Sequence, residues 1–417
     1  MVSDAYRQVH RHIERIMPKL EKPPGRWVRH PFLAITHGKF YPGTICCWDN
    51  HHMALRFADA GKPEYLRHLV DTLLDYQESN GFAPNIVLTA SGPIPCLPRF
   101  HAQPFLAQAA LIYLACTNDR NWAAAQFEPL LKYLAYYETR QMTPLGLFRW
   151  EQSWMSGMDN DVSTSFLLPE SVVTPDINAW IYLEYCAAAA LAAQLNRLRD
   201  SRRLAARAKR LHRAVNKYLW FDKVGSYAAF NLLTGLPQFH LAVGAENVQD
   251  NYAFQSCSNL IPLYARMAPR NRARQMLKKY VLGKDHFLSR FGIRSLSCSS
   301  PYYNNAFWGN PPRFGNHQRM TNSNWQGPVW VPLCYFMFHA LRYYGLKKES
   351  RDLADRTLRL LALSLKTVGS FTENYDAETG KPLYATGFAS WNLLADRMHP
   401  GLNSGRWIMD PVFSCHP

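Results

Sequence analysis

A short acidic stretch stands out in a chain that is otherwise rich in basic residues. The segment WEQSWMSGMDND, residues 150–161, places Asp159 and Asp161 among tryptophan and methionine side chains and a glycine. Burial in such apolar surroundings raises the pKa of a carboxyl group unless the group is paired. A carboxyl group that stays protonated near neutral pH is what general acid catalysis needs. Asp159 is therefore our first candidate for a catalytic residue.

Three further stretches combine carboxylate or amide groups with aromatic rings. They are YPGTICCWDNHHMAL (41–55), TNSNWQGPVWVP (321–332) and GSFTENYDAETG (369–380). The CH faces of a sugar stack on aromatic rings, while its hydroxyl groups form directed hydrogen bonds with carboxylates and amides. These stretches predict a carbohydrate site. Glu373, in the last of them, offers the second carboxyl group that glycoside hydrolysis needs.

Each candidate carboxyl group also has a structural interpretation. GMDND is a good turn sequence, so Asp159 could cap a helix or close an Asx turn, and Glu373 could be a solvated turn residue. The acidic residues that compete for the two roles are Glu151, Asp161, Asp376 and Glu378. Of these, we expect Asp161 to be solvated and Glu151 to pair with a nearby arginine.

Paired helices are expected to position these stretches. Apolar residues recur at helical spacing in paired segments, for example 51–60 with 62–79, 103–116 with 119–141, 177–197 with 199–219, and 328–344 with 346–367. A glycine follows the second helix of each pair at Gly81, Gly146, Gly225, Gly292 and Gly369, with separations of 65 to 79 residues. The pattern predicts an all-α (α/α)6 toroid of six consecutive hairpins, with long loops at the active-site end.

The polarity of the paired segments fits a toroid. INAWIYLEYCAAAALAAQL is apolar nearly all round, as an inner helix should be, whereas the segment after it carries many charges, as an outer helix should. No stretch rich in Ser, Gly or Pro suggests a linker between domains. We therefore predict a single catalytic domain over residues 1–417, with residues 290–320 as a candidate lid.

The order of the motifs resembles that of glycoside hydrolase family 63 and its trehalase-like relatives. The motifs are WD-x-x-x-M-A-L, N-G-F-x-P-N, Q-P, S-G-M-D-N, N-W-x-G-P-x-W and E-N-Y-x-x-x-T-G, followed by a late tryptophan, and they span residues 41–397. The resemblance implies an (α/α)6 barrel and hydrolysis with inversion. It also implies that Asp159 is the general acid and Glu373 the general base.

The resemblance extends to residues that would hold the sugar. Trp48 and Asp49 correspond to a pair that grips the non-reducing sugar, although a core tryptophan with a capping aspartate is the structural alternative. The other expected substrate-binding residues are Tyr41, Asn85, Gln103, Trp154, Gly157, Trp325, Gln326, Trp330 and Trp391. Relatives often carry arginine where this chain has Gln326, and this difference weakens any transfer of substrate specificity.

The resemblance also bears on the substrate. Short members of the family resemble hydrolases of glucosylglycerate and mannosylglycerate, and an anionic aglycone would suit basic groups at the pocket rim. Arg99, Arg149 and Arg294 are our candidates for such groups. We expect an inverting α-glycosidase that acts on a small α-glucoside or α-mannoside. A sugar epimerase or isomerase with catalytic histidines, or a carbohydrate-binding protein without catalysis, remains an alternative.

The composition limits the binding partners and the cellular location that we expect. The formal net charge is +16, but the basic residues gather on polar helix faces such as 195–213 and 266–279, so we expect solvated helices and no nucleic-acid partner. Nine cysteines without CxxC spacing argue against a metal cluster or a disulfide framework, and we expect no cofactor and no metal. We predict a soluble cytoplasmic protein without a membrane partner, and whether it forms a homo-oligomer stays open.

Two local pairs are assigned structural roles. His51 and His52 open an apolar helix without a third ligand at metal spacing, so we expect them to be structural. Cys46 and Cys47 lie beside the expected site, but no histidine and acidic partner at suitable spacing supports a thiol nucleophile. We expect both cysteines to serve packing only.

Overall fold

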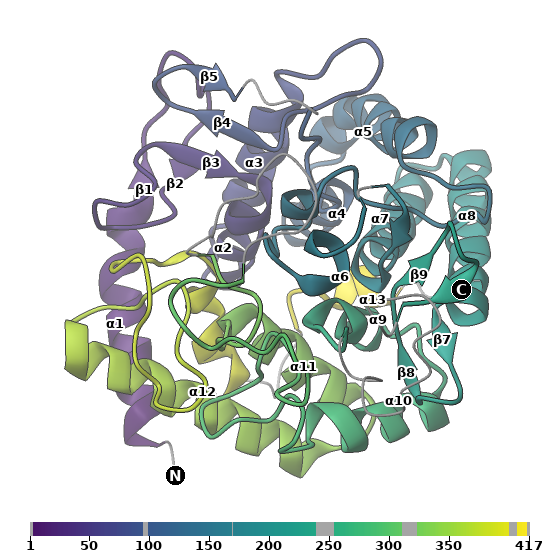
Figure 1. The fold of residues 1–417 in the computed structure, drawn as a ribbon. Coiled ribbons are helices and arrows are strands. Elements are labelled where there is room, and N and C mark those ends of the chain that lie inside the picture. The colour runs from purple at the N-terminus through teal and green to yellow at the C-terminus, as the bar shows by residue number, and fades with distance from the viewer. Residues whose placement is uncertain are drawn as a thin grey trace.

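Helices form two concentric rings in a computed structural model of the chain (Figure 1). The structure describes residues 3–94, 99–168, 170–238, 254–310, 323–399 and 407–414. No helix in these ranges is long and apolar enough to cross a membrane. The fold is the predicted (α/α)6 toroid.

Within the described ranges the inner ring has six members, and each packs on the next. They are α2 (Cys47–Asp59), α4 (Leu106–Thr117), α7 (Pro175–Gln194), the short pair η3 (Cys257–Leu260) and α9 (Ile261–Tyr264), α11 (Val331–Tyr343) and η5 (Ser390–Met398), which returns to α2. Inner helices are surrounded by protein, so they must be apolar nearly all round. Glu184 of α7 is a buried exception. It accepts hydrogen bonds from the backbone N–H groups of Ala107 and Gln108 at the start of α4, at 2.9 and 3.1 Å.

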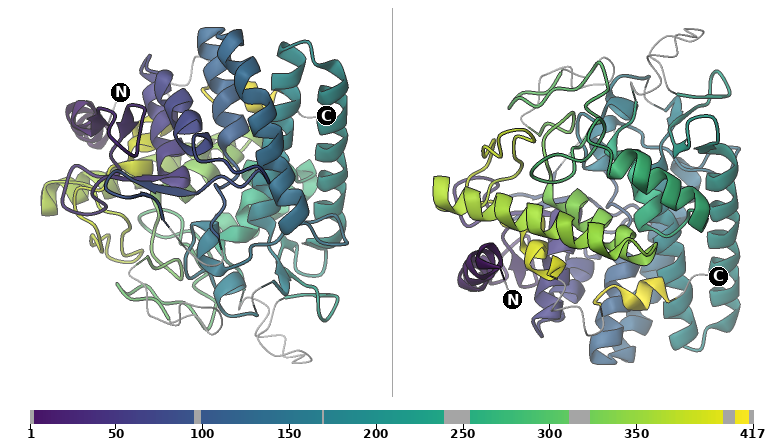
Figure 2. Two further views of the ribbon diagram at one scale, coloured as in Figure 1. Left: turned by 90° about the horizontal axis from the view of Figure 1, so that it is seen from above. Right: turned by 90° about the horizontal axis from the view of Figure 1, so that it is seen from below.

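The outer ring covers the inner one with amphipathic helices. Its members are α1 (Asp4–Leu20), α3 (Glu64–Leu74), α5 (Arg120–Arg140), α8 (Leu198–Tyr218), α10 (Arg270–Met276) with its continuation η4 (Leu277–Val281), and α12 (Lys347–Val368). In α8, Leu204, Ala208, Leu211 and Val215 are buried while the arginines face outward. Figure 2 shows α8 (teal) along one edge of the molecule and, from below, α12 (lime) across the ring.

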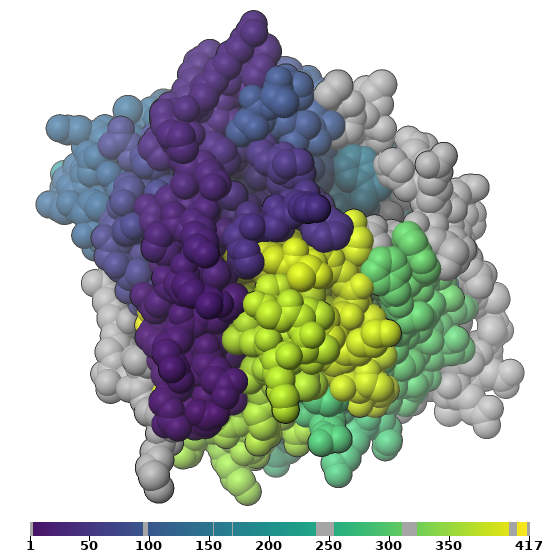
Figure 3. Space-filling model, turned by 90° about the vertical axis from the view of Figure 1, so that its left-hand side faces the viewer, coloured from purple at the N-terminus to yellow at the C-terminus, as the bar shows by residue number. Residues whose placement is uncertain are grey.

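Four of the expected hairpins are confirmed as α2–α3, α4–α5, α7–α8 and α11–α12. The prediction of six consecutive hairpins is wrong for the last one. The sixth pair joins the N-terminal helix α1 to η5, and α1 also packs on α12. Figure 3 shows the N-terminal segment (purple) lying directly against the segment that precedes the C-terminus (yellow-green). The contacts of η5 with α1 and α2 therefore close the ring.

Short strands lie in the connections between the helices. One sheet contains β3 (Thr44–Cys46), β4 (Ile86–Leu88) and β5 (Gly92–Pro93), and another contains β6 (Val172–Val173), β9 (Phe230–Asn231) and β10 (Leu236–Pro237). Two smaller pairs are β1 (Glu21–Lys22) with β2 (Phe32–Leu33), and β7 (Trp220–Phe221) with β8 (Ser226–Tyr227). All pairings are antiparallel, and Cys46 lies opposite Ile86 in the register of β3 and β4.

The two ends of the toroid differ. At the C-terminal ends of the inner helices, the short helix α13 (Asp410–Phe413) packs on α4 and α7. Trp407, just before it, stacks on His339 with ring centroids 3.8 Å apart. The candidate residues gather at the opposite end, where the N-termini of the inner helices meet and carry partial positive charge.

Candidate active site

A cavity of about 180 Å³ lies at the N-terminal ends of the inner helices. Its lining residues are Ile35, Tyr41, Thr44, Cys46, Trp48, Asp49, Asn85, Ile86, Phe100, Gln103, Trp154, Gly157, Asp159, Ser323, Glu373, Phe388 and Trp391. Three carboxyl groups, two amides and three tryptophans thus share one small space. This combination suits a polar ligand with apolar faces.

The lining residues come from all around the ring. Trp48 and Asp49 begin α2, Gln103 comes just before α4, and Trp391 lies in the first turn of η5. Asp159 lies between the short helices η1 (Ser153–Ser156) and α6 (Val162–Ser165), and Glu373 follows α12. The two candidate catalytic residues therefore follow different hairpins, as the sequence predicts.

Glu373 is buried and is held by a tyrosine. The hydroxyl group of Tyr41 donates to its two carboxylate oxygens at 3.2 and 3.0 Å. Burial raises the pKa of Glu373 well above its ordinary value, and the charges of Asp49 and Asp159 add to this, while the hydrogen bonds from Tyr41 oppose it. The tyrosine therefore favours the ionised form that a general base needs.

Asp159 is partly exposed because it faces the cavity. Desolvation raises the pKa of its carboxyl group to about 7, and the nearby charge of Asp49 contributes in the same direction. A hydrogen bond with Ser323 acts in the opposite direction. A carboxyl group in this state is still substantially protonated at neutral pH, as a general acid must be.

Asp49 is the third carboxyl group of the cavity. Its Oδ1 accepts a hydrogen bond of 2.7 Å from the hydroxyl group of Ser390 at the start of η5. Desolvation raises the pKa of Asp49 to about 6, while the hydrogen bond from Ser390 lowers it. The charge of Asp49 also raises the pKa of both Asp159 and Glu373.

The floor of the cavity brings Trp48, Gln103 and Gly157 together. Gly157 has φ +79°, and a Cβ atom there would lie 2.9 Å from Nε2 of Gln103 and 3.4 Å from Cδ2 of Trp48. Gln103 Nε2 donates to the carbonyl oxygen of Met155 at 3.1 Å. Gln103 Oε1 and Trp48 Nε1 are buried without a hydrogen-bond partner among the described residues. These two atoms are an acceptor and a donor that a bound hydroxyl group could satisfy.

Trp325, Gln326 and Trp330 lie behind the cavity and are not among its described lining residues. The indole rings of Trp325 and Trp330 stack with centroids 3.9 Å apart. Gln326 is fully buried, where its Nε2 donates to the carbonyl oxygen of Asn160 at 2.8 Å and its Oε1 accepts from the backbone N–H of Asn310 at 2.8 Å. The expected wall is therefore a supporting layer, because these side chains point into protein.

The competing acidic residues have structural partners. Asp161 is buried and caps α6, where its Oδ1 accepts from the backbone N–H of Ser163 at 2.7 Å, so the expectation that it is solvated is wrong. Glu151 pairs with Arg140 at 3.3 Å, as expected. Asp376 accepts backbone hydrogen bonds within its own turn. Among the candidate acids, Asp159 and Glu373 line the cavity.

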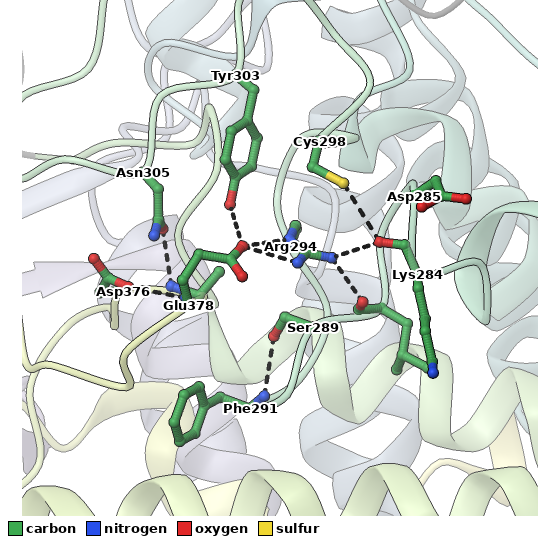
Figure 4. Close-up of polar contacts among 12 residues, drawn as sticks. Lys284, Asp285, Ser289, Phe291, Arg294, Cys298, Tyr303, Asn305, Asp376 and Glu378 are labelled. Carbon is green, nitrogen blue, oxygen red and sulfur yellow. Dashed lines mark hydrogen bonds and ion pairs between the residues drawn. The ribbon is translucent and has the colours of Figure 1, made fainter.

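The arginines expected at the rim are engaged elsewhere. Arg99 pairs with Glu78, and Arg149 pairs with Glu170 at 3.1 Å. Arg294 binds Glu378 at 2.8 Å and donates to backbone carbonyl groups, among them that of Leu288 at 2.6 Å (Figure 4). These arginines are not among the described lining residues, and the expectation of a basic rim from them is wrong for this structure.

The first part of the candidate lid is held against the loop that carries Glu373. Tyr303 donates to Glu378 at 2.9 Å, and the side-chain oxygen of Asn305 accepts from the backbone N–H of Ala377 at 2.8 Å (Figure 4). Residues 311–320 of that segment lie outside the described residues. Whether residues 290–320 move as a lid stays a prediction.

His51 and His52 lie in structural positions, as expected, whereas Cys46 lines the cavity. His51 stacks on Phe105 at 4.7 Å, and His52 Nδ1 lies 2.7 Å from the carbonyl oxygen of Trp48. Burial lowers the pKa of both histidines. Cys46 lines the cavity, although burial raises the pKa of its thiol well above the ordinary value. A thiol in that state is a poor nucleophile.

One group of possible metal ligands occurs in the described part of the chain, away from the cavity. Ligand atoms of His10, Glu14 and Asp396 lie within 4.8 Å of one another. The guanidinium group of Arg56 binds both carboxylates of this group. Arg56 thus already supplies the positive charge that a metal ion would bring. We therefore assign His10, Glu14 and Asp396 to closure of the ring.

Several lining residues were not predicted as site residues. They are Ile35, Thr44, Cys46, Ile86, Phe100, Ser323 and Phe388. Most are apolar, and an apolar residue in a loop carries no signal that separates a cavity wall from a core. Ser323 lies two residues before Trp325 within the quoted TNSNWQGP motif, so only its proximity to a motif could have suggested it.

Comparison with known families agrees with this geometry. Residues 41–391 match the model of the mannosylglycerate hydrolase MGH1-like glycoside hydrolase domain. The chain belongs to this family. The resemblance to glycoside hydrolase family 63 is thereby confirmed, and the chain carries a glycoside hydrolase domain.

Individual relatives support the same assignment at lower coverage. A mannosylglycerate hydrolase of Rubrobacter radiotolerans is 29% identical over 175 residues, which is 42% of this chain and 32% of that protein. A periplasmic trehalase of Escherichia coli K12 is 24% identical over 225 residues, 53% of this chain and 33% of that protein. The chain thus spans about a third of the length of these relatives.

Solved structures share the fold. The family 63 mannosylglycerate hydrolase of Thermus thermophilus, in complex with glucose, superposes with a TM-score of 0.70 at 20% identity, covering 93% of this chain and 99% of that one. The neutral trehalase of Saccharomyces cerevisiae superposes with a TM-score of 0.64 at 16% identity, covering 93% and 76%. At this identity the likeness concerns the fold.

Proposed function

We propose that this chain is an inverting α-glycoside hydrolase that acts on a small α-mannoside or α-glucoside. The observation that carries the proposal is the single cavity in which Asp159 and Glu373 meet Trp48, Asp49 and Gln103. Two carboxyl groups with different surroundings, one of them held by a tyrosine, are what glycoside hydrolysis by an acid and a base requires.

The chemistry assigned to the pair is as follows. Asp159 gives its proton to the glycosidic oxygen while the bond from that oxygen to the anomeric carbon breaks. Glu373 takes a proton from a water molecule that attacks the anomeric carbon from the opposite face. The α-linked substrate yields a free sugar in the β configuration and the released aglycone. Tyr41 supports Glu373 in the ionised form through one hydroxyl proton that is shared between the two carboxylate oxygens.

The size of the cavity supports a small substrate. At about 180 Å³ it is smaller than the roughly 300–1,000 Å³ typical of sites for drug-sized ligands. A space of this size suits one sugar ring, with the aglycone toward the opening. Mannosylglycerate and glucosylglycerate are the first substrates to test, because relatives in sequence and in fold are named as mannosylglycerate hydrolases.

The alternative functions receive less support. No histidine is found among the described residues that line the cavity, and a sugar epimerase or isomerase would need one or more there as proton-transfer groups. A carbohydrate-binding protein without catalysis would need no carboxyl group with a pKa of about 7, as Asp159 has.

Further parts of the proposal extend the sequence predictions. We treat residues 1–417 as one catalytic domain without nucleic-acid or membrane partners. A cytoplasmic location remains a prediction, and the relatives from Escherichia coli are named as periplasmic trehalases. The oligomeric state can be read from light scattering of the purified protein.

Kinetics of two variants test the proposal. Purified wild-type protein is incubated with mannosylglycerate, glucosylglycerate, trehalose and simple α-glucosides and α-mannosides. Asp159→Asn and Glu373→Gln should each keep the fold and lower kcat on any substrate that is hydrolysed by at least ~1,000-fold, because each removes a proton-transfer group. Asp161→Asn is the comparison for a buried carboxyl group outside the cavity. Normal turnover in either of the first two variants would refute the role assigned to that residue.

A further inference from the structure

Ser390, the first residue of η5, lies behind one of the carboxyl groups of the cavity. Its hydroxyl group donates a hydrogen bond of 2.7 Å to Asp49 Oδ1 of α2. Asp49 lines the cavity and is half-buried, whereas Ser390 is fully buried and is not among the described lining residues. The serine therefore contacts the carboxylate from the protein side, where water competes little for the hydrogen bond.

The backbone around Ser390 is fixed to the wall of the cavity. The backbone N–H groups of Ala389 and Ser390 both donate to the carbonyl oxygen of Ile35, at 3.0 and 3.1 Å. Ile35 and Trp391, the residue that follows Ser390, both line the cavity. The serine hydroxyl group thus approaches Asp49 from a segment whose own position is set by that wall.

Ser390 has a backbone conformation that serine rarely adopts. Its φ is +24°, in the left-handed region. Residues other than glycine adopt such conformations at an energetic cost, and they do so where the surrounding structure dictates it. Glycine would fit the same backbone without that cost. What serine adds at this position is the hydroxymethyl group that reaches Asp49.

The hydrogen bond from Ser390 leaves most of the acceptor capacity of Asp49 for a ligand. An ionised carboxylate has about four acceptor sites on its two oxygens, and Ser390 occupies one of them. The side chain of Cys46 also interacts with Asp49, but a thiol is a weak donor. Hydroxyl groups of a sugar are stronger donors, and a carboxylate that is already held in one orientation loses less side-chain freedom when it binds them.

We propose that Ser390 is a positioning residue that holds the Asp49 carboxylate in the orientation in which it accepts hydrogen bonds from hydroxyl groups of a sugar in the cavity. The inference rests on the proposed function, in which the cavity holds one sugar ring. Ser390 acts through Asp49 and does not contact the sugar itself. Its loss should weaken binding of the sugar in the ground state and in the transition state alike, so KM should rise while kcat changes little.

Binding of a monosaccharide tests the inference without requiring turnover. Isothermal titration calorimetry gives the Kd of D-mannose and of D-glucose for the wild-type protein and for each variant. Ser390→Ala should raise the Kd of the sugar that the wild type binds by ~10-fold, because the carboxylate loses the hydrogen bond that orients it.

Two further variants sharpen the test. Ser390→Gly removes the same hydroxyl group and also relieves the backbone strain, so it should fold at least as stably as Ser390→Ala and show the same loss of affinity. Ser226→Ala removes a buried hydroxyl group of β8 that donates to the carbonyl oxygen of Tyr227 at 2.8 Å, and it should leave both Kd values unchanged. If Ser390→Ala does not fold, Ser390→Gly still decides the result.

The pH dependence of binding separates the orientation of Asp49 from general damage to the cavity. The hydrogen bond from Ser390 lowers the pKa of Asp49, so its loss should raise that pKa above the wild-type value of about 6. The ratio of variant to wild-type Kd should therefore be larger at about pH 6.5 than at about pH 8.5, where Asp49 is ionised in both proteins. The acidic groups around Asp49 are the same in both proteins, so their effects cancel in this ratio. They are Tyr41, Cys46, Cys47, Asp159 and Glu373.

The outcomes separate the two claims. An unchanged Kd in the folded Ser390 variants would overturn the inference, as would an equal increase in Ser226→Ala or a Kd ratio that does not depend on pH. Failure of the wild-type protein to bind either sugar would overturn it as well. Absence of hydrolysis on every substrate, with a sugar still bound, would instead refute the proposed function, while the Kd values would still test the role of Ser390.

Discussion

Two residues with left-handed backbone conformations support carboxyl groups of the cavity. Tyr41 has φ +51° and donates to Glu373, and Ser390 has φ +24° and donates to Asp49. Residues other than glycine adopt such conformations at a cost of about 1–3 kcal/mol, and they do so where the surrounding structure dictates it. Local backbone strain at these two positions is consistent with a site that is built to hold charge.

At the same scale, Asp159 should make the folded protein less stable at neutral pH. The pKa of this carboxyl group is raised to about 7 in the folded state. The ordinary pKa of an aspartate carboxyl group is about 4. As pH rises from about 4 toward 7, this carboxyl group ionises freely in the unfolded chain but not in the folded chain, so stability is lost over that range. Asp159→Asn should therefore raise Tm by a few degrees in mildly alkaline buffer.

Calorimetry at two pH values checks this expectation. In acidic buffer, below the ordinary carboxyl pKa, the Tm difference between wild type and Asp159→Asn should nearly vanish, which makes the acidic measurement an internal control. A variant that is equally stable or less stable at alkaline pH would contradict the burial cost assigned to Asp159.

Residue identities were predictable from motifs, but side-chain directions were not. Trp48, Asp49 and Asp159 line the cavity as predicted, whereas Gln326 from an equally prominent motif points into protein. In an irregular loop no period relates spacing to direction. Only the partners of Gln326, such as the N–H of Asn310, show which way it faces. The catalytic roles themselves stay predictions.

At the scale of elements, the turn around Gly157 fits closely against the start of the inner helices. A methyl group at Gly157 would press on Gln103 and on Trp48. Gly157→Ala should lower kcat/KM by at least ~10-fold, because it displaces side chains that line the cavity. Gly146→Ala is the matched control, since Gly146 also has positive φ, at +71°, but a Cβ atom added there would meet no atom within 4 Å.

The comparison separates local strain from damage to the site. Both variants should lose a similar small amount of stability through their backbone conformation. Only Gly157→Ala should lose activity. Equal activity in the two proteins, measured on any hydrolysed glycoside, would show that the contact with Gln103 and Trp48 does not matter for catalysis.

Four hairpins were predictable because their apolar residues recur at helical spacing over long segments. The other helix pairs were not predictable because their helical pattern is weak. Helices α7 and α8 lie within a few residues of their predicted ranges because long apolar and amphipathic patterns define them. The pair between α8 and α11 consists of short pieces between residues 257 and 281, including the four-residue helix α9 with Pro262 near its start. Segments this short give too few turns for a helical period to be read.

At the scale of the whole molecule, a buried ion pair joins α2 to η5 and takes in residues of α1. Arg56 of α2 binds Asp396 of η5 at 3.0 Å, and both side chains are 0% exposed. Two residues of α1 join this pair. Arg56 also binds Glu14, and His10 Nδ1 lies 2.9 Å from Asp396 Oδ2. Sequence periodicity could not predict this closure because its partners are more than 300 residues apart.

Loss of this pair should weaken the whole ring. Asp396→Asn leaves the buried guanidinium group of Arg56 without its main counter-charge, which typically costs ~3–5 kcal/mol of unfolding free energy. Urea unfolding measures the change. Glu128→Gln, in an exposed pair with Arg197, is the control and should cost ~1 kcal/mol or less. A similar small loss in both variants would contradict the role of Asp396 in closure.

The stereochemistry of the released sugar tests the central claim most directly. The wild-type protein is mixed with a hydrolysed α-mannoside or α-glucoside, and the anomeric proton of the product is followed by NMR before mutarotation proceeds. The account predicts initial release of the β-anomer, because water activated by Glu373 attacks opposite the bond that Asp159 protonates. Initial release of the α-anomer would contradict the roles assigned to both residues.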